Sequence, residues 1–334
     1  TTRNGASFSE YKNFIEQNNN YPRINRIRFL AESKIYLRNN SPTSIINWFD
    51  KYPPLGGMGK IKLAEAYLEK GQVDKVGELI KEGWETATIS KNDLGYYRAK
   101  FKKFIDSEDH IKRADYLAWE KKYWDLKRML KYLPKDQRAL YNARQILMSN
   151  SYGVDNAISK VPEYLKKDPG LEFDRLRWRN RRGRLEGSLE ILYRNSIKTE
   201  EQMVRPDKWW EQRESVVRSL IYKKRYKTAY KISSEHALSA GPSFAEAEWL
   251  SGWIALTFLN SPEYAVSHFK NLYNNVGYPI SLARGAYWLG ASYEKLNEEQ
   301  LSKNFYSESA KFPMTYYGQL AFNKINPGGN FELK

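Results

Sequence analysis

Residues 61–80 read IKLAEAYLEKGQVDKVGELI, and this stretch decides the fold class. Its apolar side chains recur mostly at three- and four-residue steps, the spacing of one face of an α-helix. They are Leu63, Ala64, Tyr67, Leu68, Val73, Val76, Leu79 and Ile80. Gly71 interrupts the pattern near its middle, where it is typical of the end of a helix. The stretch therefore predicts two helices joined by a short turn, a helix hairpin.

The same pattern recurs along the chain. Residues 114–133 place Tyr116, Leu117, Trp124, Met129 and Leu130 at helical spacing and stop before Pro134. β-Branched residues nowhere alternate with polar ones over a useful length, so no sheet is expected. Successive helix pairs are therefore predicted from one end of the chain to the other.

An internal repeat lies near the C-terminal end. Residues 245–259 and 263–276 precede Pro279, and residues 283–296 and 299–312 precede Pro313. The offset is about 34–36 residues, the period of tetratricopeptide repeats. Trp253 then aligns with Trp288, which predicts packing between neighbouring helices.

The length of the chain and its repeated helix pairs indicate how it is organised. A single core stops growing near about 250–300 residues, so 334 residues predict a modular or repetitive chain. We expect an all-α superhelix of stacked antiparallel helix hairpins, a tetratricopeptide-like α-solenoid. Its predicted parts are an N-terminal helical segment over residues 1–52, an α-superhelical domain over 53–322, and a tail or linker over 323–334 toward a further domain.

The composition argues against several kinds of site. The absence of cysteine leaves no disulfide framework, thiolate zinc site or cysteine nucleophile. His110, His236 and His268 lack a second ligand at helical spacing, so neither a metal nor a cofactor is expected. Residues 56–60, GGMGK, lack the spacer and the hydroxyl residue of a phosphate loop. No stretch is apolar enough for a transmembrane segment.

The chain is basic, and its most conspicuous basic segment lies near the middle of the sequence. The chain carries 55 Lys and Arg against 39 Asp and Glu, a net charge of +16. The conspicuous basic residues are Arg175, Arg177, Arg179, Arg181, Arg182 and Arg184, which surround Trp178. They are expected to form salt bridges between helices or to bind an anionic polymer. Nucleic acid is not expected as a partner. No aromatic side chain that could stack on a base, and no pair of side chains that could contact its edge, recurs at the same position in successive helical units.

The second half of the chain contains an ordered set of motifs. These are Trp209-Trp210-Glu211-Gln212-Arg213, Ala229-Tyr230 followed by His236, residues 245–256 (AEAEWLSGWIAL), His268-Phe269, residues 279–290 (PISLARGAYWLG) and residues 316–321 (YYGQLA). Together they resemble the soluble lytic murein transglycosylase family, in the helical region that precedes its catalytic domain. A looser collinear set upstream, which includes Gly83-Trp84 and residues 168–171, extends the resemblance over nearly the whole chain.

The resemblance implies a periplasmic enzyme whose signal peptide has been removed. Such enzymes cleave the bond between N-acetylmuramic acid and N-acetylglucosamine in peptidoglycan and leave a 1,6-anhydro product. One carboxyl group suffices as acid and then base, because the attacking hydroxyl belongs to the sugar. In the family that glutamate lies in a Glu-Ser motif of a lysozyme-like domain after the superhelix. The implied partners are therefore peptidoglycan glycan strands and the protein's own C-terminal catalytic domain.

No catalytic residue is expected within these 334 residues. Glu-Ser pairs occur at Glu32-Ser33, Glu214-Ser215 and Glu308-Ser309, and each glutamate is predicted to be an exposed helical acid. A general acid would need a desolvating pocket to raise its pKa.

Contacts with glycan or with the catalytic domain are expected from aromatic and polar side chains in the resembling motifs. The candidates are Tyr316, Tyr317, Gln319, Trp209, Arg213 and Arg284. Two other functions stay open at this point: a noncatalytic tetratricopeptide-like scaffold that binds an extended peptide, and a helical repeat that binds RNA.

Overall fold

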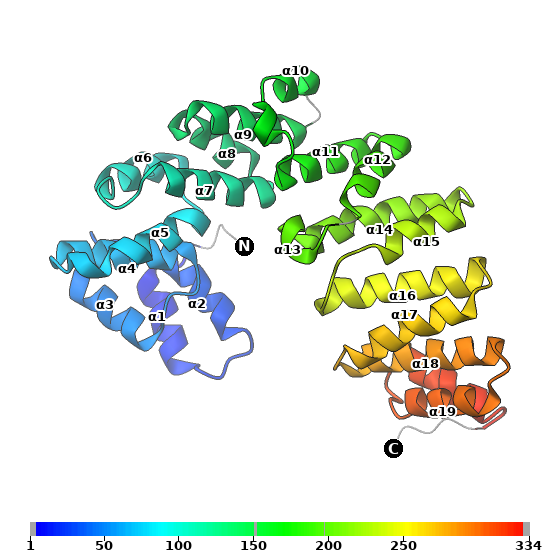
Figure 1. Cartoon of the computed structure of the whole chain (residues 1–334). Helices are drawn as coiled ribbons and strands as arrows, with labels where there is room; N and C mark the ends of the chain where they lie inside the picture. The colour runs from blue at the N-terminus through cyan, green and yellow to red at the C-terminus, as the bar shows by residue number, and fades with distance from the viewer. Residues whose placement is uncertain (1–4, 150–151, 197, 330–334) are drawn as a thin grey trace. The chain divides into compact units, whose positions relative to one another are not determined.

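The computed structural model describes residues 5–149, 152–196 and 198–329 (Figure 1). These residues form helices joined by turns, and none of them is in a strand. The all-α prediction is confirmed.

The chain divides into two compact units, Thr1–Leu171 and Glu172–Lys334. The sequence did not predict a division at this place. The loop after residue 52 instead joins two helices of the first unit, α3 and α4, which are in contact. At the other end, a helix continues to Ile325, and residues 330–334 of the predicted tail lie outside the described residues.

The first unit consists of short helices. They are α1 (Phe8–Gln17), α2 (Ile24–Glu32), α3 (Pro42–Lys51), α4 (Gly57–Glu69), α5 (Gly77–Thr86), α6 (Lys91–Lys100), α7 (Ser107–Trp119), α8 (Tyr123–Met129), α9 (Lys135–Leu147) and α10 (Val154–Ser159), with 3₁₀ turns η1 (Val73–Lys75), η2 (Leu130–Tyr132) and η3 (Glu163–Leu165). Helix α4 packs against α3 and α5, and α7 packs against α5 and α9. The hairpin predicted over residues 61–80 is the α4–α5 pair, and Gly71 takes the left-handed φ of 72° just after α4 ends.

The second unit contains longer helices. They are α11 (Pro169–Arg181), which begins in the last residues of the first unit, α12 (Leu185–Asn195), α13 (Glu200–Met203), α14 (Pro206–Tyr222), α15 (Tyr226–Ser234), α16 (Gly241–Phe258), α17 (Pro262–Asn274), α18 (Pro279–Lys295), α19 (Glu299–Ala310) and α20 (Tyr316–Ile325). From α14 onward each helix packs against the next (Figure 1). The first helices of successive pairs, α14, α16, α18 and α20, also contact one another in that order.

The repeated pairs are held together by the same packing arrangement. A Cβ atom on Gly252 of α16 would lie 2.7 Å from the ring of Phe269 on α17. One on Gly290 of α18 would lie 2.8 Å from the ring of Tyr306 on α19. In each pair a glycine lets an aromatic ring lie flush against the first helix, and Phe269 also stacks on Trp288 at 5.7 Å. The packing role predicted for the aligned aromatic residues agrees with these contacts.

Candidate functional site

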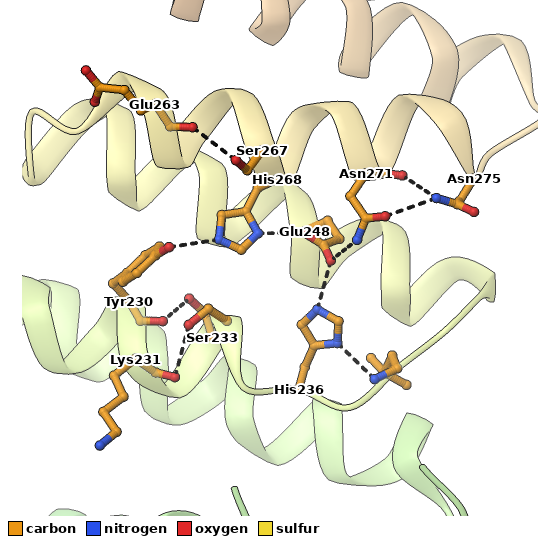
Figure 2. Close-up of polar contacts among 12 residues, drawn as sticks. Tyr230, Lys231, Ser233, His236, Glu248, Glu263, Ser267, His268, Asn271 and Asn275 are labelled. Atoms are coloured by element: carbon orange, nitrogen blue, oxygen red, sulfur yellow. Dashed lines mark hydrogen bonds and ion pairs between the residues drawn. The ribbon is translucent and has the colours of Figure 1, made fainter. Parts of the chain in front are cut away.

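A buried carboxylate joins three helices of the second unit (Figure 2). Glu248 of α16 accepts hydrogen bonds from Asn271 Nδ2 on α17 at 2.6 Å and from His268 Nδ1, also on α17, at 2.6 Å. His236, in the loop between α15 and α16, lies with Nε2 3.3 Å from Oε1 of Glu248. The hydroxyl of Tyr230 on α15 lies 3.0 Å from Nε2 of His268. We call these five residues the Glu248 network.

Hydrogen bonding determines which protons the network holds. The backbone N–H of Leu238 donates to Nδ1 of His236 at 2.9 Å, so the Nε2 of that ring carries a proton and donates to Glu248. Burial by itself raises the pKa of Glu248, but the hydrogen bonds from His236 and His268, together with the charge these rings carry when protonated, outweigh it and lower the pKa to about 2. Burial raises the pKa of Tyr230, which therefore stays a neutral phenol.

These values decide what the network can do. A general acid must hold its proton near neutral pH, and a carboxyl with a pKa of about 2 does not. A tyrosine whose pKa is raised is likewise a poor nucleophile. The carboxyl of Glu248 therefore does not serve as a general acid, and the hydrogen bonds of the Glu248 network hold α15, α16 and α17 together.

Several residues of the resembling motifs meet in this network. Tyr230 and His236 come from one motif, Glu248 from a second and His268 from a third, and their contacts span 12 to 38 residues of sequence. Helical spacing brings together only residues three or four positions apart, so it could not indicate these partners of the histidines. No local signal could have paired them, because the pairing depends on how three helices pack.

Aromatic rings gather on the first helices of the last pairs. Trp249 of α16 lies 5.9 Å from Trp253 and 6.4 Å from Trp288 of α18. Tyr317 of α20 lies 5.3 Å from Tyr287 of α18. We call these five rings, together with Tyr316 and Phe269, the aromatic cluster. Most of its rings are partly buried, but Tyr316 is 70% exposed and lies 5.2 Å from Tyr317.

Four of the six predicted contact residues lie in or beside the aromatic cluster. Arg284 packs over the ring of Trp249 at 5.3 Å and pairs with Glu246 at 2.9 Å. Gln319 is exposed one turn after Tyr316, and its Nε2 donates to the carbonyl of Pro313. The structure thus brings Arg284, Tyr316, Tyr317 and Gln319 into one region of α18 and α20.

The other two candidates lie in the interior. Trp209 is 1% exposed, and its indole N–H donates to the carbonyl of Met203 at 3.0 Å. Arg213 is fully buried and donates to the carbonyl of Ile232 on α15. Both side chains serve packing within the second unit and offer no exposed surface to a ligand. Their place in a resembling motif did not reveal this, because burial depends on the helices packed around them.

The arginine segment divides into two halves. Its first half is paired with acids: Arg175 with Glu172 at 2.9 Å, Arg177 with Asp174 at 3.1 Å, and Arg179 with Glu190 at 3.0 Å. Arg181, Arg182 and Arg184 are exposed, and the last two lie over the ring of Trp178 at 5.1 and 4.8 Å. Of these pairs only Arg179–Glu190 joins two helices, α11 and α12, as predicted; the other two lie within α11. The exposed positive charge lies at the end of α11.

One Glu-Ser prediction is wrong. Glu32 is not an exposed acid; it is 3% exposed and lies against the N-terminus of α4. Its carboxylate accepts hydrogen bonds from the backbone N–H groups of Leu55 and Gly56. Burial raises its pKa, while these bonds and one from Gly59 oppose the rise. Glu214 and Glu308 are half-exposed and pair with arginine and lysine one turn away.

Glu32 also explains the glycine-rich residues 56–60. A Cβ atom on Gly59 would lie 2.5 Å from the carboxyl carbon of Glu32. The N-terminus of a helix attracts an anion, and at the start of α4 that anion is the carboxylate of Glu32. The rejection of a phosphate loop on sequence grounds agrees with this contact.

Comparison of the chain with protein-family models, with curated proteins and with solved structures found no match. Within the described residues, no group of three or more His, Asp or Glu side chains is arranged to hold a metal ion. No helix in the same residues is long and apolar enough to cross a membrane.

Proposed function

We propose that this chain is the helical scaffold of a periplasmic peptidoglycan lytic transglycosylase and that it binds glycan strands. In this proposal its helix pairs stack as a tetratricopeptide-like solenoid, and the general acid belongs to a lysozyme-like domain of the same protein. The ordered motifs that resemble the family support the assignment, as does the meeting of four of their residues in the Glu248 network.

The observation that carries glycan binding is the exposed end of the aromatic cluster. Tyr316 presents most of its ring to solvent, and the amide of Gln319 lies on the same helix. Sugars offer an apolar ring face surrounded by hydroxyl groups, so aromatic side chains with polar groups beside them suit this ligand. A row of first helices bearing such rings would let one strand touch several helix pairs.

Positive charge adds a second, less specific attraction. The stem peptides of peptidoglycan carry carboxylates, and the chain has a net charge of +16. Arg181, Arg182 and Arg184 provide exposed cations within the second unit. Such contacts are individually weak and are screened by salt. We therefore expect binding in two parts, one sensitive to salt and one that depends on the aromatic rings.

The test is sedimentation of the chain with purified sacculi at rising salt. The chain should pellet with sacculi at low salt, and Tyr316→Ala should lower the fraction bound several-fold at every salt concentration. Tyr222→Ala is the matched control, because Tyr222 is 89% exposed at the end of α14 in the same unit. Equal pelleting with and without sacculi at low salt would overturn the proposal and favour a scaffold that binds protein.

A further inference from the structure

A buried lysine lies in the first unit, on the helix whose start contacts Glu32. Lys62 of α4 is 3% exposed. Its Nζ donates to the hydroxyl of Tyr97 at 2.6 Å and lies over the rings of Tyr36 and Tyr97 at 4.4 and 5.3 Å. Lysine is almost never fully buried unless it is paired. Two tyrosine rings and one phenol oxygen give this ammonium only part of what water would provide.

The two acids near Lys62, Glu65 and Asp93, make their hydrogen bonds and ion pairs with other side chains. Glu65 accepts a hydrogen bond from Tyr96 and pairs with Lys100 at 3.2 Å. Asp93 accepts from the hydroxyl of Ser90 at 2.7 Å. Within residues 5–149, Lys62 makes no ion pair of its own with a carboxylate. Burial lowers the pKa of Lys62, and the charges of Glu65 and Asp93 oppose this shift without cancelling it.

Lys62 lines a cavity of about 230 Å³. Hydroxyl groups of Ser33, Thr88 and Ser90 share its wall, and these three residues are exposed, so the cavity is reached from solvent. A larger cavity of about 530 Å³ adjoins it, because Ser33, Met58 and Thr88 line both. The walls of the larger cavity include apolar side chains of Phe29, Leu30, Leu55 and Met58.

We propose that the two cavities form a binding site for an amphipathic carboxylic acid, with its carboxylate at Lys62 and its apolar body in the larger cavity. A bound carboxylate would add a counter-charge directly at Lys62, and the hydroxyl group of Thr88 would donate a further hydrogen bond to it. Each cavity is lined by charges of both signs, Lys34, Lys62 and Asp93 in the smaller and Arg26, Lys60 and Glu32 in the larger. The orientation therefore follows from the apolar wall of the larger cavity, which suits the apolar body of the ligand. This inference does not depend on the proposed function of the second unit.

Met58 provides a direct reporter, since its side chain lines both cavities. The chain labelled with ¹³C-methyl methionine would be titrated with 4-phenylbutyrate, with its neutral amide 4-phenylbutyramide, and with inorganic phosphate. We expect a saturable shift of the Met58 methyl signal with the acid and about tenfold weaker binding of the amide. Met129 and Met203 are fully buried elsewhere and should not respond.

Two variants test the role of the ammonium. Lys62→Met keeps the length of the side chain and should weaken the acid about tenfold or more while leaving the amide unchanged. Lys75→Met is the matched control, because Lys75 also lies over a tyrosine ring, Tyr67 at 4.9 Å, but lines neither cavity. It should bind the acid as the wild type does.

Several results would overturn the proposal. The wild type could respond equally to the acid and the amide, or to neither at millimolar concentration. Phosphate could shift Met58 where the acid does not, which would assign the site to a different anion. Unchanged binding of the acid by Lys62→Met would remove the ammonium from recognition. The comparison of acid with amide uses the wild type alone, so it holds even if Lys62→Met fails to fold.

Discussion

Replacement of Glu248 by glutamine tests the Glu248 network directly. The side chain keeps its shape but can no longer ionise. Its carbonyl oxygen can still accept a hydrogen bond, whereas its NH₂ group would face donors from His236, His268 or Asn271. At least one buried donor then loses its acceptor, which is costly in the interior.

The size of the effect follows from the pKa of the carboxyl group. That pKa falls from an ordinary value of 4.5 to about 2 on folding. Since each tenfold change in proton affinity is worth about 1.4 kcal/mol, the ionised carboxylate stabilises the fold by about 3 kcal/mol at neutral pH. A lowered pKa gives stability that is present above pH 4.5 and is lost as the pH falls toward 2. The difference in unfolding free energy between the wild type and Glu248→Gln should therefore shrink to about 1 kcal/mol at pH 3.

Hydrogen exchange read by mass spectrometry localises this loss. A loss of about 3 kcal/mol corresponds to roughly 100-fold faster exchange of backbone amides that open with the network. We expect it in peptides from α15, α16 and α17 at pH 7 and not in peptides of the first unit. Urea unfolding at pH 7 and pH 3 then gives the change with pH.

Glu263→Gln is the control, because Glu263 is exposed on α17 and its side chain makes no contact in the network (Figure 2). It should change stability by less than about 0.5 kcal/mol. The reasoning is refuted if Glu248→Gln slows or barely changes exchange in α15 to α17. It is also refuted if the gap between wild type and variant is as large at pH 3 as at pH 7.

Two further predictions concern packing. Gly252→Ala should destabilise the second unit by about 1–3 kcal/mol, because its Cβ would meet the ring of Phe269. Gly95→Ala, in the open middle of α6, is the control and should be neutral or stabilise by up to about 1 kcal/mol. Equal shifts of the melting temperature in the two variants would contradict the close packing at Gly252. Arg113→Met should destabilise the first unit by about 2 kcal/mol, because the carbonyls of Trp84 and Ala87 lose their buried donor. Exchange in residues 77–89 should rise, and no rise there would remove Arg113 from that role.

Part of the fold was readable from the sequence because helix formation is local. The apolar spacing in residues 61–80 predicted the α4–α5 pair, and the offset near the C-terminal end predicted the α16–α17 and α18–α19 pairs. The limits of these helices were less well predicted. Helix α4 begins at Gly57, four residues before the quoted stretch. The carboxylate of Glu32 accepts from the N–H groups of Leu55 and Gly56 just before this start and from that of Gly59 in the first turn.

The candidate site was only partly predictable. Tyr316, Tyr317, Gln319 and Arg284 were expected from the resembling motifs. The structure places Arg284 over Trp249 and Tyr317 beside Trp288, with Tyr316 and Gln319 on the same helix as Tyr317. Trp209 and Arg213 carried the same sequence signal but are buried. A motif records which residues occur together in a sequence, whereas exposure depends on the neighbouring helices.

The sequence by itself determined an all-α chain of helix pairs, its positive charge and its lack of cysteine chemistry. Only the tertiary structure brought Glu248 to His236 and His268, enclosed Glu32 at a helix start, and buried Lys62 against the hydroxyl of Tyr97. The physical reason is distance along the chain. Apolar periodicity repeats within three or four residues, while these polar contacts join side chains 12 to 35 residues apart and exist only after helices have packed.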